Sequence, residues 1–276
     1  MANINITDSQ LDMFFAEKAF SPRTEEQYRS ILTVFLRTVN LYTCTATEVQ
    51  KFLRNSGWGN SRQYVASVAI RHFLRWKFGE HPALRVRVKR EKPRPGRILS
   101  ETQIVNLLES FNRDTMKGCR DYAIACFALD TGLRVNEIAS IQIGDLDLDK
   151  RMVLVKVKGG RWEKAFFSIH TASALERWLH MRDPKDPRLF QVTREGLKVI
   201  VRKWGEKIGI KLSPHDFRRT FAVMAIKAGA PTRLVQVAGH WSDIRMVEYY
   251  TSAISAIDLG PYFPTNYLEK SLETER

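Results

Sequence analysis

The stretch SPHDFRRTF, residues 213–221, combines a clear helix start with an unusual amount of positive charge. Ser213 is a good N-cap, Pro214 suits the first helical position, and Asp216 follows the cap by three residues in a variant of the capping box. We therefore expect a helix that begins at residue 214 and carries a histidine and two arginines in its first turns.

The faces of this helix predict different roles. Phe217 and Phe221 are four residues apart and belong to a buried stripe, whereas His215 and Arg218 are three apart and share another face. The amino end of a helix attracts anions, because its free N–H groups and its dipole favour negative charge. His215 and Arg218 therefore indicate a phosphate site; the alternative is a solvated arginine beside a packed core histidine.

The charge of the whole chain indicates a polyanionic partner. Of its 276 residues, 44 are Lys or Arg and 30 are Asp or Glu, which gives a formal net charge of +14. Such an excess is usually maintained for nucleic acid, with an anionic membrane surface as the rival. No apolar run approaches the roughly 18 residues that a membrane span needs, and the start does not resemble a signal peptide. We expect nucleic acid and no membrane.

The cysteines and histidines predict neither a disulfide nor a metal site. Cys44, Cys119 and Cys126 are odd in number and lack CxxC spacing, and two of them fall in an apolar helical stretch. The six histidines lack metal-ligand spacing. We expect no metal ion and a reducing, cytoplasmic location.

A basic segment, RVRVKREKPRPGR at residues 85–97, divides the chain. It holds seven Lys or Arg, two prolines and a glycine, a composition that cannot form a core. We predict a helical DNA-binding domain at 1–84, a linker at 85–97 and a second domain at 98–276. The linker is expected to lie along a phosphate backbone, with a mere spacer as the alternative. Its predicted DNA contacts are Arg87, Lys89, Arg90, Lys92 and Arg94.

Apolar stripes in the first domain predict a small helical bundle. One stripe covers residues 28–39 and another covers 65–74, and the polar faces carry several arginines. Arg62 and Gln63 could reach DNA from such a face. For any single one of these residues, a solvated helix surface is the alternative.

The second domain is predicted to be mainly α with a small antiparallel hairpin. An apolar helix ends at Gly132, and strands are expected at 152–157 and 165–169 with GGRWEK as their turn. Further helices are predicted at 171–182, 193–208, 214–228 and 232–238, and again from about residue 243. The fold class is therefore mainly α with a small antiparallel sheet, in two domains.

Two other parts of the second domain carry candidate cations. Arg134 follows the glycine-ended helix and precedes Glu137, with which it could simply form an ion pair at three-residue spacing. The hairpin lifts Lys156 or Lys158 towards its turn, where lysines are usually just solvated.

The stretch AGHWSDIRMVEYYT, residues 238–251, adds a histidine and two tyrosines. His240 follows a glycine that ends a helix, and Tyr249 and Tyr250 lie about two turns into the next. Cleavage of a phosphodiester without water needs a nucleophile, a proton donor for the leaving oxygen and cations around the phosphorus. Arginines, a hairpin lysine, histidines and a tyrosine can supply all of these without metal or cofactor.

The order Arg, hairpin Lys, His-x-x-Arg, Gly-His, Tyr resembles the tyrosine recombinase/integrase family, in its compact, Xer-like type. LDMFFAEKAFSPRTEEQYRSILTVFLRTV is similar to the opening helices of that family's core-binding domain. SRQYVASVAIRHFLRWKFG followed by KPRPGRILSETQIVNLL resembles the family's passage into its catalytic domain. The likeness covers nearly the whole chain.

The resemblance implies a role for each candidate residue. Arg134 and Arg218 would clamp the phosphate, Glu137 would orient the site, and His215 and His240 would occupy the two histidine positions. Lys158, followed by glycine, matches the family's hairpin lysine, with Lys156 left open because GGRWEK is a long turn. Trp241 is an apparent insertion after Gly-His, so counting from His240 selects Tyr249. Aligning SDIRMVEYYT by its helix selects Tyr250, which we take as the nucleophile, with Tyr249 in reserve.

The implied function is site-specific recombination of double-stranded DNA through a 3′-phosphotyrosyl intermediate, for integration, excision or resolution. The resemblance further implies a homotetramer on DNA, a monomer or weak oligomer when free, and a possible accessory protein. Type IB topoisomerase-like strand relaxation and a non-catalytic DNA-binding regulator of the same fold are the alternatives. The tail after Tyr250 would dock in a neighbouring subunit or fray.

Overall fold

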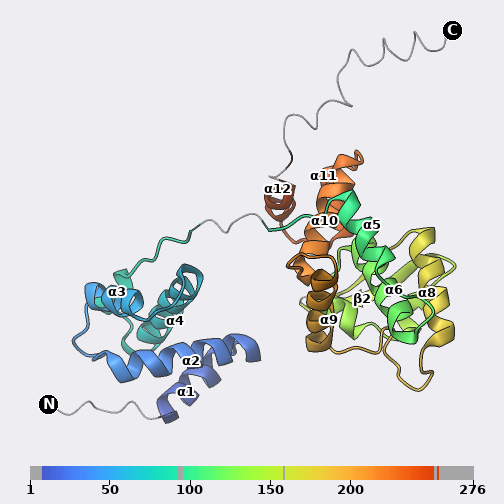
Figure 1. Ribbon diagram of the computed structural model, residues 1–276. Helices are drawn as coiled ribbons and strands as arrows, with labels where there is room; N and C mark the ends of the chain where they lie inside the picture. The colour runs from blue at the N-terminus through green and yellow to red at the C-terminus, as the bar shows by residue number, and fades with distance from the viewer. Residues whose placement is uncertain (1–7, 92–95, 158, 252–253, 255–276) are drawn as a thin grey trace, which may run out of the picture. The chain divides into compact units, whose positions relative to one another are not determined.

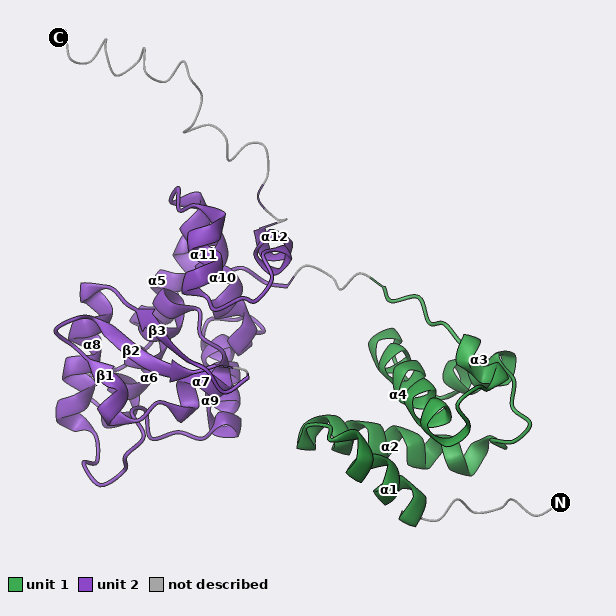
Figure 2. Ribbon diagram, turned by 180° about the vertical axis from the view of Figure 1, so that it is seen from behind, with its two compact units in different colours: residues 1–94 green, residues 95–276 purple. Residues whose placement is uncertain are grey.

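The computed structural model describes residues 8–91, 96–157, 159–251 and 254. The chain separates into two compact units, residues 1–94 and 95–276, which are coloured green and purple in Figure 2. Each unit has a hydrophobic core of its own. We describe each unit by itself.

The first unit is a helical bundle. Its helices are α1 (Asp8–Lys18), α2 (Pro22–Thr38), α3 (Ala46–Asn55) and α4 (Asn60–Phe78), followed by a short 3₁₀ turn at Pro82–Arg85. Ser21 caps α2, and Thr45 forms a reciprocal capping box with Glu48 at the start of α3. Phe14, Phe35 and Phe73 are fully buried, and aromatic side chains fill much of this core.

Residues 86–91 lie against the first unit. Val86 is buried in its core, and Gln50 donates a hydrogen bond to the carbonyl of Arg87. Asn60, at the start of α4, donates to the carbonyl of Lys89 and accepts from the N–H of Glu91. The first part of the basic segment is therefore fixed by α3 and by the start of α4.

The second unit is mainly helical with one small sheet, which confirms the predicted fold class. Its helices are α5 (Glu101–Glu109), α6 (Met116–Thr131), α7 (Val135–Ser140), α8 (Ile169–Met181), α9 (Arg194–Lys207), α10 (Pro214–Lys227), α11 (Thr232–Ala238) and α12 (Arg245–Thr251). The strands are β1 (Leu146–Asp147), β2 (Met152–Lys156) and β3 (Trp162–Phe166), antiparallel in the order β1-β2-β3, and a 3₁₀ turn covers Ile143–Asp145.

The hairpin differs from its sequence prediction. Strand β3 begins at Trp162, so Trp-Glu-Lys is paired strand and only residues 157–161 form the connection. The sequence assigned these three residues to the turn. In the structure they belong to the strand, and their side chains are largely exposed at the sheet edge. Gly159 and Gly160 both have positive φ, a backbone conformation that favours glycine. The turn GGRWEK is therefore shorter than the sequence indicated.

Helix α6 is the centre of the second unit (Figure 1) and is buried along most of its length. It packs against α8 and α10. Gly132 ends α6 in the left-handed conformation, with φ of 57°, and a Cβ there would lie 2.4 Å from the ring of Phe221 on α10. Glycine is thus needed both to turn the chain and to admit α10, and the turn delivers Arg134 to the start of α7.

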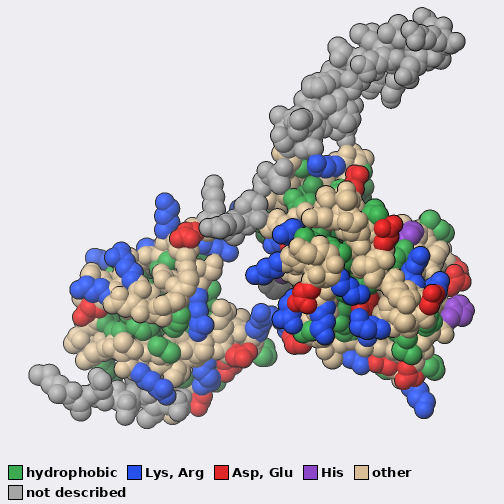
Figure 3. All heavy atoms as spheres, in the orientation of Figure 1, with side chains coloured by type: hydrophobic (Ala, Val, Ile, Leu, Met, Phe, Trp, Pro, Cys, Tyr) green, Lys and Arg blue, Asp and Glu red, His purple; other side chains and the backbone are tan. Residues whose placement is uncertain are grey.

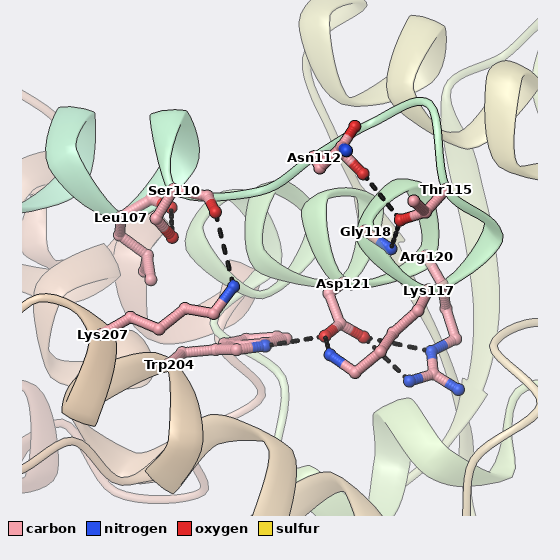
Figure 4. A network of polar contacts seen from close by, with 10 residues as sticks. All are labelled: Leu107, Ser110, Asn112, Thr115, Lys117, Gly118, Arg120, Asp121, Trp204 and Lys207. Atoms are coloured by element: carbon pink, nitrogen blue, oxygen red, sulfur yellow. Dashed lines mark hydrogen bonds and ion pairs between the residues drawn. The ribbon is translucent and has the colours of Figure 1, made fainter.

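A buried carboxylate joins α6 to α9 (Figure 4). Asp121 is 1% exposed and accepts hydrogen bonds from Lys117 at 2.8 Å, from Arg120 at 2.9 Å and from the indole of Trp204 at 3.1 Å. The Trp204 ring lies edge-on to Phe217 of α10 at 6.0 Å. The network therefore fixes α9 against the helix that carries His215 and Arg218.

None of the helices in the described ranges is long and apolar enough to cross a membrane. Within the same ranges, no group of three or more His, Cys, Asp or Glu residues could hold a metal ion. Cys44, Cys119 and Cys126 are buried free thiols.

Candidate active site

Arg218 is the buried centre of the site. It is 2% exposed, and its two terminal nitrogens donate 2.6 Å hydrogen bonds to the carbonyls of Gly132 and Gly239, where α6 and α11 end. Burial and then the nearby charge of Arg134 lower the pKa of Arg218 to about 10, and Glu137 and Tyr250 act in the opposite direction. The guanidinium thus remains a cation at neutral pH in a place of low polarity.

Arg134 and Glu137 form a capping box at the start of α7. The carboxylate of Glu137 accepts from the main-chain N–H of Arg134 at 2.7 Å and from its guanidinium at 2.8 Å. Glu137 is 4% exposed, whereas the side chain of Arg134 is 34% exposed. The predicted ion pair is therefore present, and it leaves the arginine open to solvent on one side.

His215 stands beside both arginines at the start of α10. His215 is exposed as a whole residue, but its ring is partly removed from water. This desolvation, and then the positive charges of Arg219 and Arg218, lower the pKa of His215. Asp216 accepts from the N–H and hydroxyl of Ser213 and from Arg219 at 2.8 Å. The predicted helix start is confirmed, and the imidazole is favoured in its neutral form.

His240 links the last helices to the hairpin. Its backbone has a φ of 53°, and its Nε2 lies 3.0 Å from the carbonyl of Lys164 on β3. Nδ1 of the same ring is buried without a hydrogen-bond partner in the described structure. A hydrogen bond between Nε2–H and the carbonyl would leave Nδ1 as a free acceptor.

Of the tyrosine pair, Tyr250 interacts with the buried arginine. Its phenol raises the pKa of Arg218 through its charge and a hydrogen-bonding interaction, and its ring is 5.9 Å from the guanidinium of Arg219. Tyr249 packs its ring 5.8 Å from that of Tyr250. Both tyrosines are half-buried on α12.

Only one of the two candidate lysines of the hairpin lies within the described residues. Lys156 is the last residue of β2 and is exposed, paired with Trp162 of β3. Lys158 lies outside the described residues, so the choice between the two lysines stays a prediction.

Most of the predicted DNA-contacting side chains of the first unit can be located. Arg62 lies over the ring of Trp58 at 4.9 Å, and Gln63 donates to the carbonyl of the same tryptophan at 2.7 Å. Arg90 lies 5.7 Å from the ring of Tyr64, whereas Arg87 donates to the carbonyls of Leu84 and Val86. Lys89 is exposed, and Lys92 and Arg94 lie outside the described residues. Their contact with DNA stays a prediction.

Two residues of the site were not predicted. Trp241 contacts both Arg218 and Tyr250, and Arg219 faces the ring of Tyr250. Trp241, directly after Gly-His, was recognisable in the sequence as an insertion. Its contacts, however, depend on how α10, α11 and α12 pack together. Arg219 is the second arginine of the predicted helix start and had no predicted role of its own.

The gathered site is strongly cationic. Arg134, Arg218 and Arg219 come from two helices, with Glu137 and Asp216 as their carboxylate partners. Lys and Arg side chains are also spread over the visible surfaces of both units (Figure 3). Such a cluster of guanidinium groups can bind the non-bridging oxygens of a phosphate while a phenol stands beside it.

Comparison with known proteins agrees with this chemistry. Residues 97–255 match the model of the phage integrase family. The chain is 31% identical over 257 residues to tyrosine recombinase XerC of Corynebacterium efficiens, covering 85% of this chain and 82% of that protein. It is also 31% identical over 195 residues to tyrosine recombinase XerA of Saccharolobus solfataricus, covering 70% of this chain and 63% of that one.

Solved structures show the same fold. A lambda integrase dimer bound to a core site superposes with a TM-score of 0.73 at 13% identity, covering 91% of this chain and 96% of that one. The XerH recombinase bound to its difH substrate gives 0.67 at 19% identity, with coverages of 90% and 83%. The chain therefore belongs to the phage integrase family. It is an enzyme of the tyrosine recombinase class, as the sequence predicted.

Proposed function

We propose that this recombinase cuts and rejoins a specific double-stranded DNA site with Tyr250 as its nucleophile. The phenolic oxygen of Tyr250 attacks the scissile phosphorus, a P–O bond forms to tyrosine, and the bond from phosphorus to the 5′ oxygen breaks. The product is a 3′-phosphotyrosyl linkage and a free 5′ hydroxyl. A second 5′ hydroxyl then attacks the linkage and restores the phenol, so no metal or cofactor is consumed.

The observation that carries this assignment is the place of Tyr250 beside Arg218. The phenol interacts with a guanidinium that is held by two carbonyls and cannot move away. Phosphate bound there would lie next to the phenolic oxygen, and positive charge would stabilise the phosphorane.

The other groups have distinct proposed roles. Arg134, oriented by Glu137, clamps a second non-bridging oxygen with its exposed side. Neutral His215 accepts the phenolic proton of Tyr250 during attack, and His240 binds the phosphate from the other helix end. Lys158, or Lys156 in its place, protonates the leaving 5′ oxygen.

The assembly and location belong to the same proposal. We infer a homotetramer around two duplexes, a monomer or weak oligomer when free, and a cytoplasmic location. The basic segment with Lys89 and Arg90 would contact phosphates, together with Arg62 and Gln63. The first unit at 1–84, the linker at 85–97 and the second domain at 98–276 are the proposed DNA-binding, connecting and catalytic parts.

A nicked suicide duplex tests the nucleophile. The duplex carries the natural site with a nick just 3′ of the scissile phosphate, so that the short fragment diffuses away and the covalent adduct accumulates. We expect an adduct with the wild type and with Tyr249→Phe, and none with Tyr250→Phe. The reverse result would move the nucleophile to Tyr249. Sequence-specific binding without any adduct would favour the regulator.

A further inference from the structure

We propose that Trp241 is a positioning residue for cleavage: its indole holds Tyr250, rather than Tyr249, against the phosphate-binding Arg218. This inference rests on the proposed role of Tyr250. It concerns a residue that interrupts the spacing between His240 and the tyrosine pair.

The indole contacts both partners. The guanidinium carbon of Arg218 lies 3.9 Å from the centroid of the Trp241 ring, and the Tyr250 ring lies 5.6 Å away at 61°, edge to face. Both contacts are of the favourable kind, a cation over an indole face and a T-shaped aromatic pair. One side chain thus joins the phosphate cation to the nucleophile.

The indole itself is firmly held. Trp241 is 5% exposed, and its main chain exchanges two 3.0 Å hydrogen bonds with Gln236 of α11. A Cβ on Gly239 would lie 1.9 Å from the six-membered ring, so the indole packs directly on bare backbone. Phe221 of α10 stacks at an interplanar angle of 21°. The ring therefore has a fixed place between α10, the end of α11 and α12.

Helix geometry explains why this ring selects one tyrosine. Consecutive residues on a helix differ by about 100° in direction, so Tyr249 and Tyr250 leave α12 in different directions. Val247 is fully buried in the small core that contains Trp241, and Tyr250 lies three residues further on the same face. Packing of Val247 and Tyr250 on the indole thereby fixes the rotation of α12.

A tryptophan that only filled space at this position would be energetically unfavourable. Its Nε1–H is buried and has no hydrogen-bond partner in the described structure, a penalty that phenylalanine would avoid. Tryptophan also makes the strongest cation–π contact of the aromatic side chains. Contact with the Arg218 cation is therefore the property that distinguishes this indole from an ordinary core ring.

The test measures adduct formation on the suicide duplex at saturating DNA, together with DNA affinity and the melting temperature. For Trp241→Ala we expect a fall of about 10²-fold in the cleavage rate, the usual effect of a displaced reacting group. DNA affinity should change by less than about threefold. Trp241→Phe should recover part of the rate, because a phenyl ring keeps a weaker cation–π contact. If Trp241→Ala unfolds the second unit, the test depends on Trp241→Phe, whose cleavage rate should be below that of the wild type.

Trp178→Phe is the matched control. Trp178 is also buried, and its indole donates to the carbonyl of Leu189, which is not one of the site residues. This variant should lower the melting temperature and leave the cleavage rate within about threefold of the wild type. The inference is overturned if the folded Trp241 variants cleave at the wild-type rate, or if Trp178→Phe loses as much rate as Trp241→Phe. A wild type that forms its adduct elsewhere than on Tyr250 would overturn both this inference and the proposed function.

Discussion

Arg218 donates a 2.6 Å hydrogen bond to the carbonyl of Gly132, 86 residues earlier in the chain. A second bond of 2.6 Å reaches the carbonyl of Gly239, so one guanidinium joins the ends of α6 and α11 to α10. The carboxyl ends of helices carry partial negative charge and free carbonyls, which makes them natural partners for a buried cation. The same contacts that complete the fold therefore fix the direction of the phosphate-binding group.

The guanidinium of Arg218 makes two hydrogen bonds with its two terminal nitrogens, and this geometry predicts that lysine cannot replace it. An ammonium group keeps the charge but cannot reach both carbonyls and a phosphate oxygen in one plane. For Arg218→Lys we expect the rate of adduct formation to fall by about 10²–10³-fold, the usual cost of one lost transition-state donor. Arg202→Lys, a change at an exposed arginine of α9, is the control and should retain the wild-type rate.

Glu137 predicts a measurable loss of stability because its carboxylate is buried and holds two donors of Arg134. Glu137→Gln keeps the shape but weakens both hydrogen bonds, and we expect the second unit to lose about 1–3 kcal/mol in urea denaturation. Asp147→Asn removes the carboxylate from the pair with Lys150, whose side chain is 73% exposed, and should shift the unfolding free energy by less than about 1 kcal/mol. Equal losses for the two variants would argue against a special place for Glu137.

Local signals in the sequence were enough to predict most of the second unit's helices. Ser213, Pro214 and Asp216 form the predicted start of α10, and Gly132 ends α6 as expected. These features depend on neighbours within four residues, which sequence patterns reveal. The order of the basic residues then predicted that they meet, and the structure brings Arg134 and Arg218 together.

The misjudged features depend on distant contacts. Strand β3 was predicted to start at residue 165, whereas it starts at Trp162. Trp162 is exposed and its neighbours are charged, as in a turn, and only their pairing with β2 makes these residues part of a strand. The importance of Trp241 arises from Arg218, Tyr250 and Phe221, which lie on other segments. No pattern near residue 241 encodes those contacts, although the inserted position itself was visible.

Asp121 predicts a structural effect separate from chemistry. Its carboxylate is 1% exposed and accepts bonds from Lys117, Arg120 and Trp204. Asp121→Ala leaves the indole N–H and two cations without an acceptor, so we expect a loss of about 3–5 kcal/mol in the second unit. Asp114→Ala is the control, because the Asp114 carboxylate is 88% exposed in its pair with Arg177. It should shift the unfolding free energy by no more than about 0.5 kcal/mol.

The basic segment predicts a salt signature. If Lys89 contacts a phosphate, Lys89→Gln should weaken binding to all duplex sequences alike and reduce the slope of log affinity against log salt by about 1. Fluorescence anisotropy at several salt concentrations measures both quantities. Lys150→Gln changes the same charge at an exposed turn of the second unit and should leave the slope as in the wild type. Identical slopes for wild type and Lys89→Gln would contradict the phosphate contact.

His215 predicts a pH dependence of stability with a definite sign. Partial burial and the charges of Arg219 and Arg218 lower the pKa of His215 in the folded chain below its ordinary value of 6.5. Between the two pKa values the unfolded chain binds the proton and the folded chain does not. The unfolding free energy therefore rises with pH across this window and falls as the pH drops through the folded pKa.

Replacing the imidazole should remove this part of the pH dependence. Between about pH 7.5 and pH 5.5, the unfolding midpoint of the second unit should fall more in the wild type than in His215→Gln. Neutral His215 is also the form that can accept a proton, so the wild-type cleavage rate should fall on acidification. His180→Gln, a change on α8, should retain the wild-type response on both measures. If His215→Gln loses midpoint stability on acidification as steeply as the wild type does, the imidazole is not held neutral by the arginines.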